Sequence, residues 1–412
     1  MMRLLIFSMI CIVYTSCGAN HNAENHPVNS DVDFEKNDYE KITHSNNTLG
    51  FDMLQHVEPN ESDNLFISPT SLYMAMLMIY NGADGETKNE IETVLNLEDI
   101  SRDEANKANA SLLSMLDKNT DHIQLDLAQS IWVNNDFTLQ GDYQTVNKDY
   151  LHADVHSMDT SEEASVDKIN EWVKTATHDK ITDIIEPPLH KDTVALLLNA
   201  IYFNGDWTFP FDPEKTEDET FYLENGTQTN VKMMALHGDE LAYMENNMFQ
   251  AVSLPYGDGQ MSMKIFLPKV DNGLTTFTKE LTSDNWQRWQ DEFTEQEGTV
   301  HLPKFEIDYE TSLNQTMIDL GIQTAFTEDA EFPYMIQEDD PINISEIKQK
   351  TYINIDETGT EAAGATSAEM QTTSAPINEP FSITINKPFF ITITDDDTDT
   401  ILFMGAIKKP CE

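Results

Sequence analysis

The stretch from Glu357 to Ala368 reads Glu-Thr-Gly-Thr-Glu-Ala-Ala-Gly-Ala-Thr-Ser-Ala. An alternating, strand-like segment, Thr351 to Asp356, precedes it, and a second one, Phe381 to Ile385, follows it. About two dozen residues, mostly small or polar, lie between these two segments. A loop of this length inside a compact domain is usually functional, because most connections between secondary-structure elements are short.

The alternation of residue types in this loop indicates its function. In an extended chain, successive side chains point to opposite faces. Glu361 and Glu369 then share one face, and the other face is uncharged and can enter a sheet without burying a charge. That face carries Thr360, Ala362, Gly364, Thr366, Ala368, Met370 and Thr372. A flexible linker, or a short Ala/Glu helix weakened by Gly364 and Thr366, is the alternative interpretation.

The composition limits the partners of the protein. The 412 residues are enough for one large domain or for two to three small ones. The net charge is −49, from 73 acidic residues against 24 basic ones. Such a surface repels DNA, RNA and anionic membranes, so we expect no nucleic-acid partner.

The N-terminal segment predicts export. Leu4 to Tyr14 is an apolar run of 11 residues, which is typical of a secretory signal. The following Thr-Ser-Cys-Gly resembles a bacterial lipobox, in which Cys17 carries the lipid, and cleavage after Ala19 is the alternative. In both cases the chain leaves the cytoplasm, and a lipid on Cys17 would tether it to a membrane surface. We therefore assign residues 1–17 to the signal and the polar residues 18–47 to a disordered spacer.

The remaining residues, 48–412, predict one α+β domain. Ser68 and Pro69 begin a buried helix that Asn81-Gly82 ends. Thr193 to Phe203 is almost continuously apolar and predicts a central strand that is buried on both faces. No linker rich in Pro and Gly divides this part of the chain.

Motifs of enzymatic chemistry are missing from the sequence. It has no Gly-x-Ser-x-Gly, no His-Glu-x-x-His and no phosphate-binding glycine loop. Cys11, Cys17 and Cys411 have no metal-binding spacing, and Asp395 to Asp399 lacks the Gly and Glu of a calcium loop, so it reads as a solvated hairpin tip. We expect neither an enzyme nor a bound metal or cofactor.

Four blocks of sequence resemble the serpins, the family of serine protease inhibitors. Glu357 with Gly359–Ala365 resembles the hinge of the serpin reactive-centre loop, and Asn386–Phe390 resembles the C-terminal signature. Asn64–Leu72 resembles a further serpin block, and so does the set made of Asn199–Phe203, Gly205, Trp207 and Pro210-Phe211. The resemblance implies an α+β fold with three β-sheets, eight or nine helices and an exposed reactive-centre loop.

The resemblance also assigns individual residues. It places a lysine, Lys304, beside the hinge glutamate Glu357, and Trp207 next to the anchored end of the loop. The hinge consists of Glu357, Gly359, Thr360, Glu361, Ala362, Ala363, Gly364 and Ala365. The region where the central sheet opens contains Ser68, Ser71, Asn199 and Gln349. Many serpins have His at this last position, and Gln349 can donate and accept hydrogen bonds without a pH effect.

The spacing from the hinge glutamate places the reactive bond at Thr373-Ser374, with Met370-Gln371 as the alternative. No Lys, Arg or Asp lies between Thr358 and Asn386, so a trypsin-like pocket finds no cation in the loop. Elastase-like or subtilisin-like proteases fit better, and a Glu-specific protease at Glu369 is a further candidate.

Together these features predict a monomeric suicide inhibitor of serine, or also cysteine, endopeptidases. It forms a covalent complex with its target and is secreted or lipid-anchored at the cell surface. The alternative is a protein of the same fold that acts as a binding or surface protein without inhibiting a protease.

Overall fold

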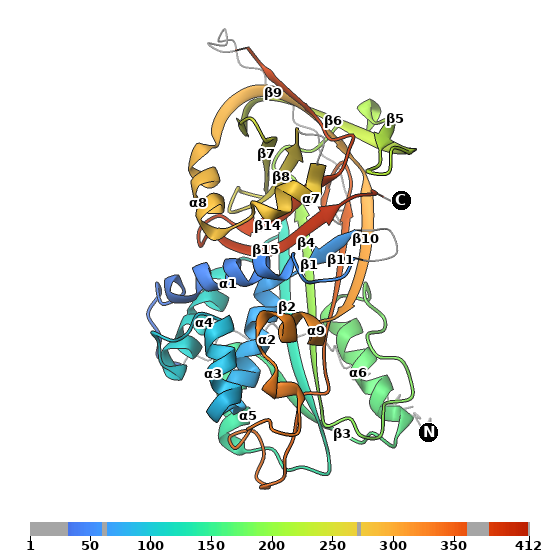
Figure 1. Ribbon diagram of the computed structural model, residues 1–412. Helices are drawn as coiled ribbons and strands as arrows, with labels where there is room; N and C mark the ends of the chain where they lie inside the picture. The colour runs from blue at the N-terminus through green and yellow to red at the C-terminus, as the bar shows by residue number, and fades with distance from the viewer. Residues whose placement is uncertain (1–31, 60–63, 270–272, 361–378, 411–412) are drawn as a thin grey trace, which may run out of the picture.

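The computed structural model describes residues 32–59, 64–269, 273–360 and 379–410 (Figure 1). Within these residues the chain forms nine α-helices, in agreement with the eight or nine expected. The helices are α1 (Glu40–Met53), α2 (Pro69–Gly82), α3 (Gly85–Val94), α4 (Arg102–Leu116), α5 (Gly141–Leu151), α6 (Glu163–Ala176), α7 (Gly273–Lys279), α8 (Ser283–Glu292) and α9 (Asn314–Leu320). In this part of the chain, no helix combines the length and the apolar composition needed to cross a membrane.

A six-stranded sheet runs along the long axis of the molecule (Figure 1). In spatial order its strands are β10 (Phe305–Ser312), β11 (Glu346–Ile355), β12 (Gly359–Thr360), β4 (Ala195–Asp206), β2 (Ile123–Asn134) and β3 (Asp154–Met158). Strand β4 is antiparallel to β2 and parallel to β11, so it is central, as its sequence predicted.

Strand β4 is buried on both faces because helices cover both sides of the sheet. Leu197 and Ile201 belong to the main core, which includes α2. Leu196 and Leu198 belong to a second, smaller core that also contains Val166 and other residues of α6. The continuous apolar run of β4 is therefore split residue by residue between two cores.

The other strands form a nine-stranded network at the upper end of the molecule in Figure 1. It consists of β1 (Leu65–Ile67), β15 (Thr400–Ile407), β14 (Phe389–Asp395), β8 (Met261–Pro268), β7 (Phe249–Tyr256), β6 (Gln228–Glu245), β9 (Thr294–Pro303) and β13 (Phe381–Thr384), with β5 (Glu217–Tyr222) paired to β6. Short 3₁₀ turns occur at Pro213–Lys215 and Thr324–Phe326.

The described strands hydrogen-bond into two networks, because two of the three sheets that the resemblance implied are joined into one. The reason is the length of β6, which has 18 residues. Its first part pairs with β5 and its last part with β7, and its register with β9 shifts between Gly238 and Leu241. This strand joins two differently oriented groups of strands into one network.

The folded part begins earlier than the sequence predicted. The spacer was expected to reach residue 47, but α1 begins at Glu40. Its polar residues face the protein: the side-chain amide of Asn47 donates to the carbonyl of Asp399 (2.8 Å), and its oxygen accepts from the amide of Ile401 (3.0 Å). The polar residues that suggested a spacer thus include Asn47, which hydrogen-bonds to the β14–β15 hairpin. Cys17 and the signal segment lie outside the described residues.

The acidic hairpin tip is less solvated than expected. Asp395, at the end of β14, is fully buried. Lys118 forms ion pairs with Asp395 and Asp397, and the backbone amide of Thr398 donates to Asp395 (2.9 Å). The tip is thus a closed turn that is neutralised in part by a lysine.

Candidate functional site

The upper end of the six-stranded sheet contains a fork between β4 and β11 (Figure 1). Lower in the sheet, Glu346–Thr351 pairs directly with Leu196–Ile201 in the parallel sense. Higher up, β12 lies between the two strands, with Thr360 paired to Ile355 on one side and to Gly205 on the other. The first residues of the hinge therefore already occupy a strand position in the central sheet.

A tight turn at Asp356 reverses the chain between β11 and β12. The Asp356 side chain accepts from the backbone amide of Thr358 (2.7 Å) and from that of Gly359 (3.3 Å). The backbone amide of Asp356 donates to the carbonyl of Gly359 (3.0 Å). Aspartate favours turns because its side chain bonds to the backbone that follows it.

Position 359 requires glycine because the space around it admits no side chain. A Cβ at this position would lie 2.0 Å from the carbonyl oxygen of Gly205, which belongs to β4. Two backbones approach closely at this position, which excludes every side chain.

Thr360 is buried, with 1% of its surface exposed. Its hydroxyl lies 2.7 Å from the hydroxyl of Tyr256, at the end of β7. Burial raises the pKa of Tyr256, so the phenol stays protonated and can hydrogen-bond to Thr360. The sequence analysis missed Tyr256, because an aromatic residue at the end of a strand does not reveal its partner.

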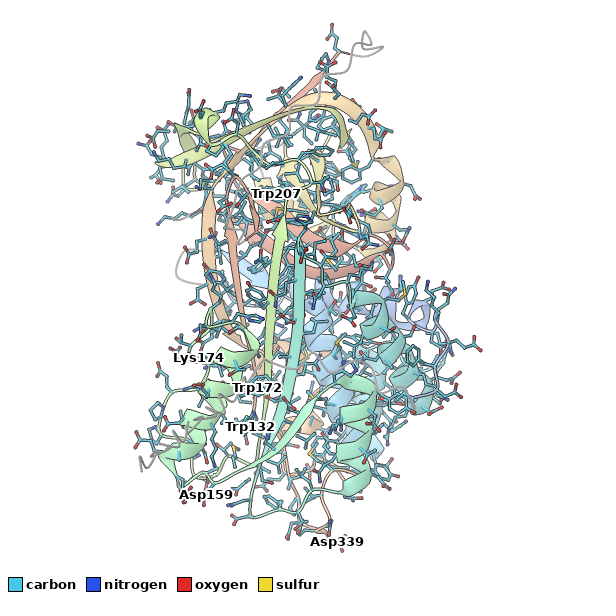
Figure 2. All side chains as sticks on the ribbon, turned by 180° about the vertical axis from the view of Figure 1, so that it is seen from behind. Trp132, Asp159, Trp172, Lys174, Trp207 and Asp339 are labelled. Carbon is cyan, nitrogen blue, oxygen red and sulfur yellow. The ribbon has the colours of Figure 1, made fainter. Side chains whose placement is uncertain are left out.

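Trp207 lies at one end of the central strands, far from Asp339 at the other end of the molecule (Figure 2). Its backbone amide donates to the carbonyl of Thr358 (2.9 Å), and its indole Nε1 donates to the carbonyl of Asp356 (3.0 Å). The indole also stacks on Tyr256, with 4.4 Å between ring centroids. The residue thus lies beside the anchored end of the loop, where the resemblance placed it.

Lys304 and Glu357 are adjacent, as the resemblance implied. The ammonium group of Lys304 lies 2.8 Å from one carboxylate oxygen of Glu357, and the hydroxyl of Thr216 donates to the other (2.7 Å). Burial by itself would raise the pKa of Glu357, but the hydrogen bonds from Lys304 and Thr216 hold it below its ordinary value. Thr216 was missed, since nothing in its local sequence indicates this contact.

The four residues assigned to sheet opening meet where β4 and β11 pair directly, and all are buried. Gln349 stands opposite Asn199 in this pairing. The Gln349 amide accepts from the backbone N–H of Ser68 (3.0 Å) and donates to its carbonyl (2.9 Å). The hydroxyl of Ser71 donates to Asn199 (3.0 Å). These bonds connect the joined strands to the first turn of α2.

Gln129 extends this group and was missed. It stands opposite Asn199 across the β2–β4 pairing and is buried. Neither polar atom of its side chain, nor the side-chain nitrogen of Asn199, has a hydrogen-bond partner among the described residues. Gln129 lies in an alternating segment, Ile123 to Asn134, that indicates a strand but not which polar residue faces the core.

The remaining predicted residues cannot be placed. The rest of the hinge, both candidate reactive bonds and the lipidation site lie outside the described residues. These are Glu361, Ala362, Ala363, Gly364, Ala365, Met370, Gln371, Thr373, Ser374 and Cys17.

Comparison with known proteins identifies the family of the chain. Residues 44–410 match the family described as Serpin (serine protease inhibitor), and the chain therefore belongs to this family. It is 31% identical to Iripin-2 of Ixodes ricinus over 90% of this chain and 94% of that protein. It is also 31% identical to an uncharacterized serpin-like protein of Methanosarcina acetivorans, over 90% of this chain and 86% of that one.

Solved structures show the same fold. The thermophilic serpin Tengpin in the native state superposes with a TM-score of 0.84 at 28% identity, covering 92% of this chain and 96% of that one. Human thyroxine-binding globulin in complex with its ligand superposes with a TM-score of 0.82 at 25% identity, covering 91% and 100%. The second similarity shows that this fold also occurs in a protein described by ligand binding.

Proposed function

We propose that the protein is a suicide inhibitor of serine endopeptidases, extending to cysteine endopeptidases, that acts by inserting its cleaved loop into the six-stranded sheet. The observation that carries this proposal is the position of β12. Gly359 and Thr360 already pair with both β11 and β4, so a longer strand can grow from a start that exists. The protein is a protease inhibitor by family and has no enzymatic role in this scheme.

In the proposed reaction, the protease nucleophile attacks the carbonyl carbon of the reactive bond, Thr373-Ser374 or Met370-Gln371. The peptide bond breaks, the new amine leaves, and the loop remains on the protease as an acyl ester or thioester. The freed arm from Glu357 to Thr373, 17 residues at about 3.3 Å each, spans roughly 56 Å when extended.

Insertion of this arm carries the attached protease toward the opposite end of the sheet. The protease active site is then distorted, and a displacement of about 1 Å can slow a catalysed step by about 100-fold. Hydrolysis of the acyl bond therefore nearly stops. The intact protein is held in a state that is kinetically stable rather than the most stable one.

The residues of the arm suit the target class that we propose. Because the loop has no Lys, Arg or Asp between Thr358 and Asn386, elastase-like or subtilisin-like proteases are the expected targets. We further propose that the protein is exported, either freely or with a lipid on Cys17, and that it acts as a monomer.

The test is to mix the full-length protein with an elastase-type, a subtilisin-type and a trypsin-type protease and to analyse the products on a denaturing gel. We expect a band at the summed mass with one of the first two proteases. The same protease with its nucleophile replaced by Ala should give no such band. If only cleaved fragments appear with every protease, the protein is a substrate and the non-inhibitory alternative holds.

A further inference from the structure

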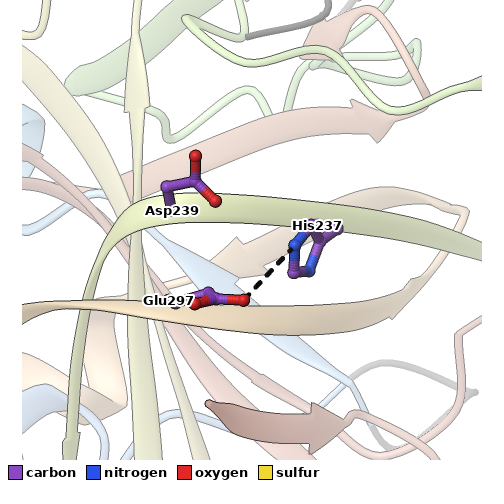
Figure 3. A group of neighbouring side chains, drawn as sticks. All are labelled: His237, Asp239 and Glu297. Carbon is purple, nitrogen blue, oxygen red and sulfur yellow. Dashed lines mark ion pairs between the residues drawn. The ribbon is translucent and has the colours of Figure 1, made fainter. Parts of the chain in front are cut away.

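A histidine and two carboxylates come together on the surface between β6 and β9. His237 and Asp239 belong to β6, and Glu297 belongs to β9 (Figure 3). One ligand atom from each of the three lies within 4.8 Å of the other two. Nε2 of His237 is 3.9 Å from a carboxylate oxygen of Glu297.

The backbone explains why these residues converge. His237 stands opposite Thr299, and Gly238 stands opposite Gly298. The register then shifts before Leu241, so that two residues of β6 face one residue, Glu297, of β9. A bulge of this kind bends the strand and redirects side chains, and here a carboxylate oxygen of Asp239 lies within 4.8 Å of one of Glu297.

The imidazole of His237 is held in one orientation. Its Nδ1 lies 3.2 Å from the hydroxyl of Thr299. Nε2 is therefore the nitrogen that faces the carboxylates. Metal-binding histidines in proteins generally have such a partner on the second ring nitrogen, since it fixes the ring and its tautomer. The side chain of His237 is 57% exposed and that of Glu297 is 30% exposed, so an ion can reach the group from solvent.

We propose that His237, Asp239 and Glu297 form a site for a divalent transition metal of the Zn²⁺ class. One imidazole and two carboxylates supply three ligands, and water supplies the fourth. The imidazole favours Zn²⁺ over Mg²⁺ and Ca²⁺, which prefer sites built of oxygen alone. Two ligands bound tetrahedrally at about 2.0 Å lie about 3.3 Å apart, so His237 and Glu297, which are 3.9 Å apart, and Asp239, within 4.8 Å of both, must move closer together to bind one ion.

Sequence analysis predicted no metal site, because the third ligand lies on a strand far along the chain. The position has a structural consequence, because a bound metal links β6 to β9. Gly298, which follows Glu297 in β9, pairs with Phe381 of β13. The metal would therefore reinforce the sheet beside the strand that follows the reactive loop. Binding is measured without a protease, so its outcome is independent of the proposed inhibition.

The test uses isothermal titration calorimetry of the full-length protein with Zn²⁺, in a buffer with excess Mg²⁺ that occupies the sites made only of oxygen. Titration with Co²⁺ gives an absorption spectrum that reports nitrogen ligation. We expect one specific site in the wild type, and at least a tenfold weaker affinity in His237→Ala and Glu297→Gln, about the range seen when metal sites lose supporting groups. Thermal denaturation should show a Zn²⁺-dependent rise in stability that both variants lack.

His301 provides the matched control. It lies on β9, and among the described residues it pairs with one carboxylate, that of Glu219 at 3.9 Å, which gives two ligand groups in place of three. His301→Ala should leave Zn²⁺ binding unchanged. The proposal is overturned if His237→Ala binds Zn²⁺ as the wild type does, or if the wild type shows no specific site. Glu297→Gln preserves the shape of the side chain, so it remains informative should His237→Ala fold poorly.

Discussion

Strands β4 and β11 are hydrogen-bonded directly to each other over Glu346–Thr351, whereas at their upper ends β12 lies between them. The lower region has six parallel residue pairs and is fastened to α2 through Gln349. The upper region is fastened to β7 through Thr360 and Tyr256. One pair of strands therefore shows both a joined and a separated arrangement.

This difference shows how the sheet could accept a longer strand. Each residue added to β12 would replace a parallel pairing of β4 with β11 by two antiparallel pairings. Antiparallel pairing is slightly more stable per residue, and the number of ladders rises from one to two. The side-chain hydrogen bonds of Gln349 and Asn199 would have to break or rearrange before β12 could lengthen past them.

The largest expected effect is a gain in stability when β4 and β11 separate along their whole length. A single cut in the loop should allow full insertion, so that the lower region adopts the arrangement of the upper one. We expect the unfolding temperature to rise by at least about 10 °C, which corresponds to several kcal/mol for a chain of this size. Differential scanning calorimetry of intact and cleaved protein measures this. Equal unfolding temperatures would mean that the joined arrangement is already the most stable one.

Thr360→Arg should prevent β12 from holding its place between β4 and β11. Its guanidinium would be buried on the face of the sheet where Thr360 contacts Tyr256, without a charged partner, at a cost of several kcal/mol. We expect cleavage by the target protease to continue while the yield of covalent complex falls at least about tenfold. Densitometry of denaturing gels measures both products. Thr360→Val is the matched control, since it removes the hydroxyl bond to Tyr256 but keeps the shape and adds no charge. Normal complex formation by the Arg variant would contradict the role given to β12.

Gln349→Leu should weaken the lower region. It leaves the backbone N–H of Ser68 buried without its partner and removes one of two donors to the Ser68 carbonyl, which keeps the amide of Leu72. The free energy of unfolding should therefore fall by about 1–3 kcal/mol. Denaturant titration measures the change. An unchanged midpoint would show that the Gln349 bonds do not hold the joined strands.

Gln349→His tests the same hydrogen bonds to Ser68 by introducing a side chain that titrates. A neutral imidazole can accept from Ser68, but a protonated one cannot, so the folded state should lower the pKa of this histidine. The stability of the variant should then be complete above about pH 6.5 and decline as the pH falls through the folded pKa, relative to the wild type. Parallel pH profiles for both proteins would oppose this assignment.

The smallest effect concerns the ion pair at the turn. Lys304→Ala should cost about 1 kcal/mol or less, because the pair is partly exposed. The pKa of Glu357 is lowered in the folded state, so the contribution is present above its unfolded value and is lost as the pH falls through the folded pKa. The stabilities of wild type and variant, followed by denaturant titration, should therefore converge in acid. A constant difference at all pH values would assign the effect to packing of the lysine stem.

Local chemistry made part of this structure predictable. Ser68 caps α2 as expected, because a hydroxyl before Pro69 satisfies an amide of the first turn. The apolar run of β4 correctly indicated burial on both faces. These features depend on residues that are neighbours in the chain.

Contacts between distant segments were not predictable in the same way. Tyr256 meets Thr360, and Gln129 stands opposite Asn199, only because of strand register, which the sequence of one strand does not specify. The start of the folded domain was misplaced because Asn47 of α1 finds its hydrogen-bond partners in the last hairpin of the chain. The bulge that brings Asp239 near Glu297 depends on the pairing of β6 with β9.

Trp207 gives the molecule an intrinsic optical probe. Its indole stacks on Tyr256 and donates to the carbonyl of Asp356, at the turn from which an inserting strand would grow. The emission of tryptophan depends on such neighbours, so a change at the fork should alter its fluorescence. The sequence has only five tryptophans, and replacing the other four by Phe would leave a signal from this one position. Stopped-flow recording of that signal would time the movement of the loop without any attached dye.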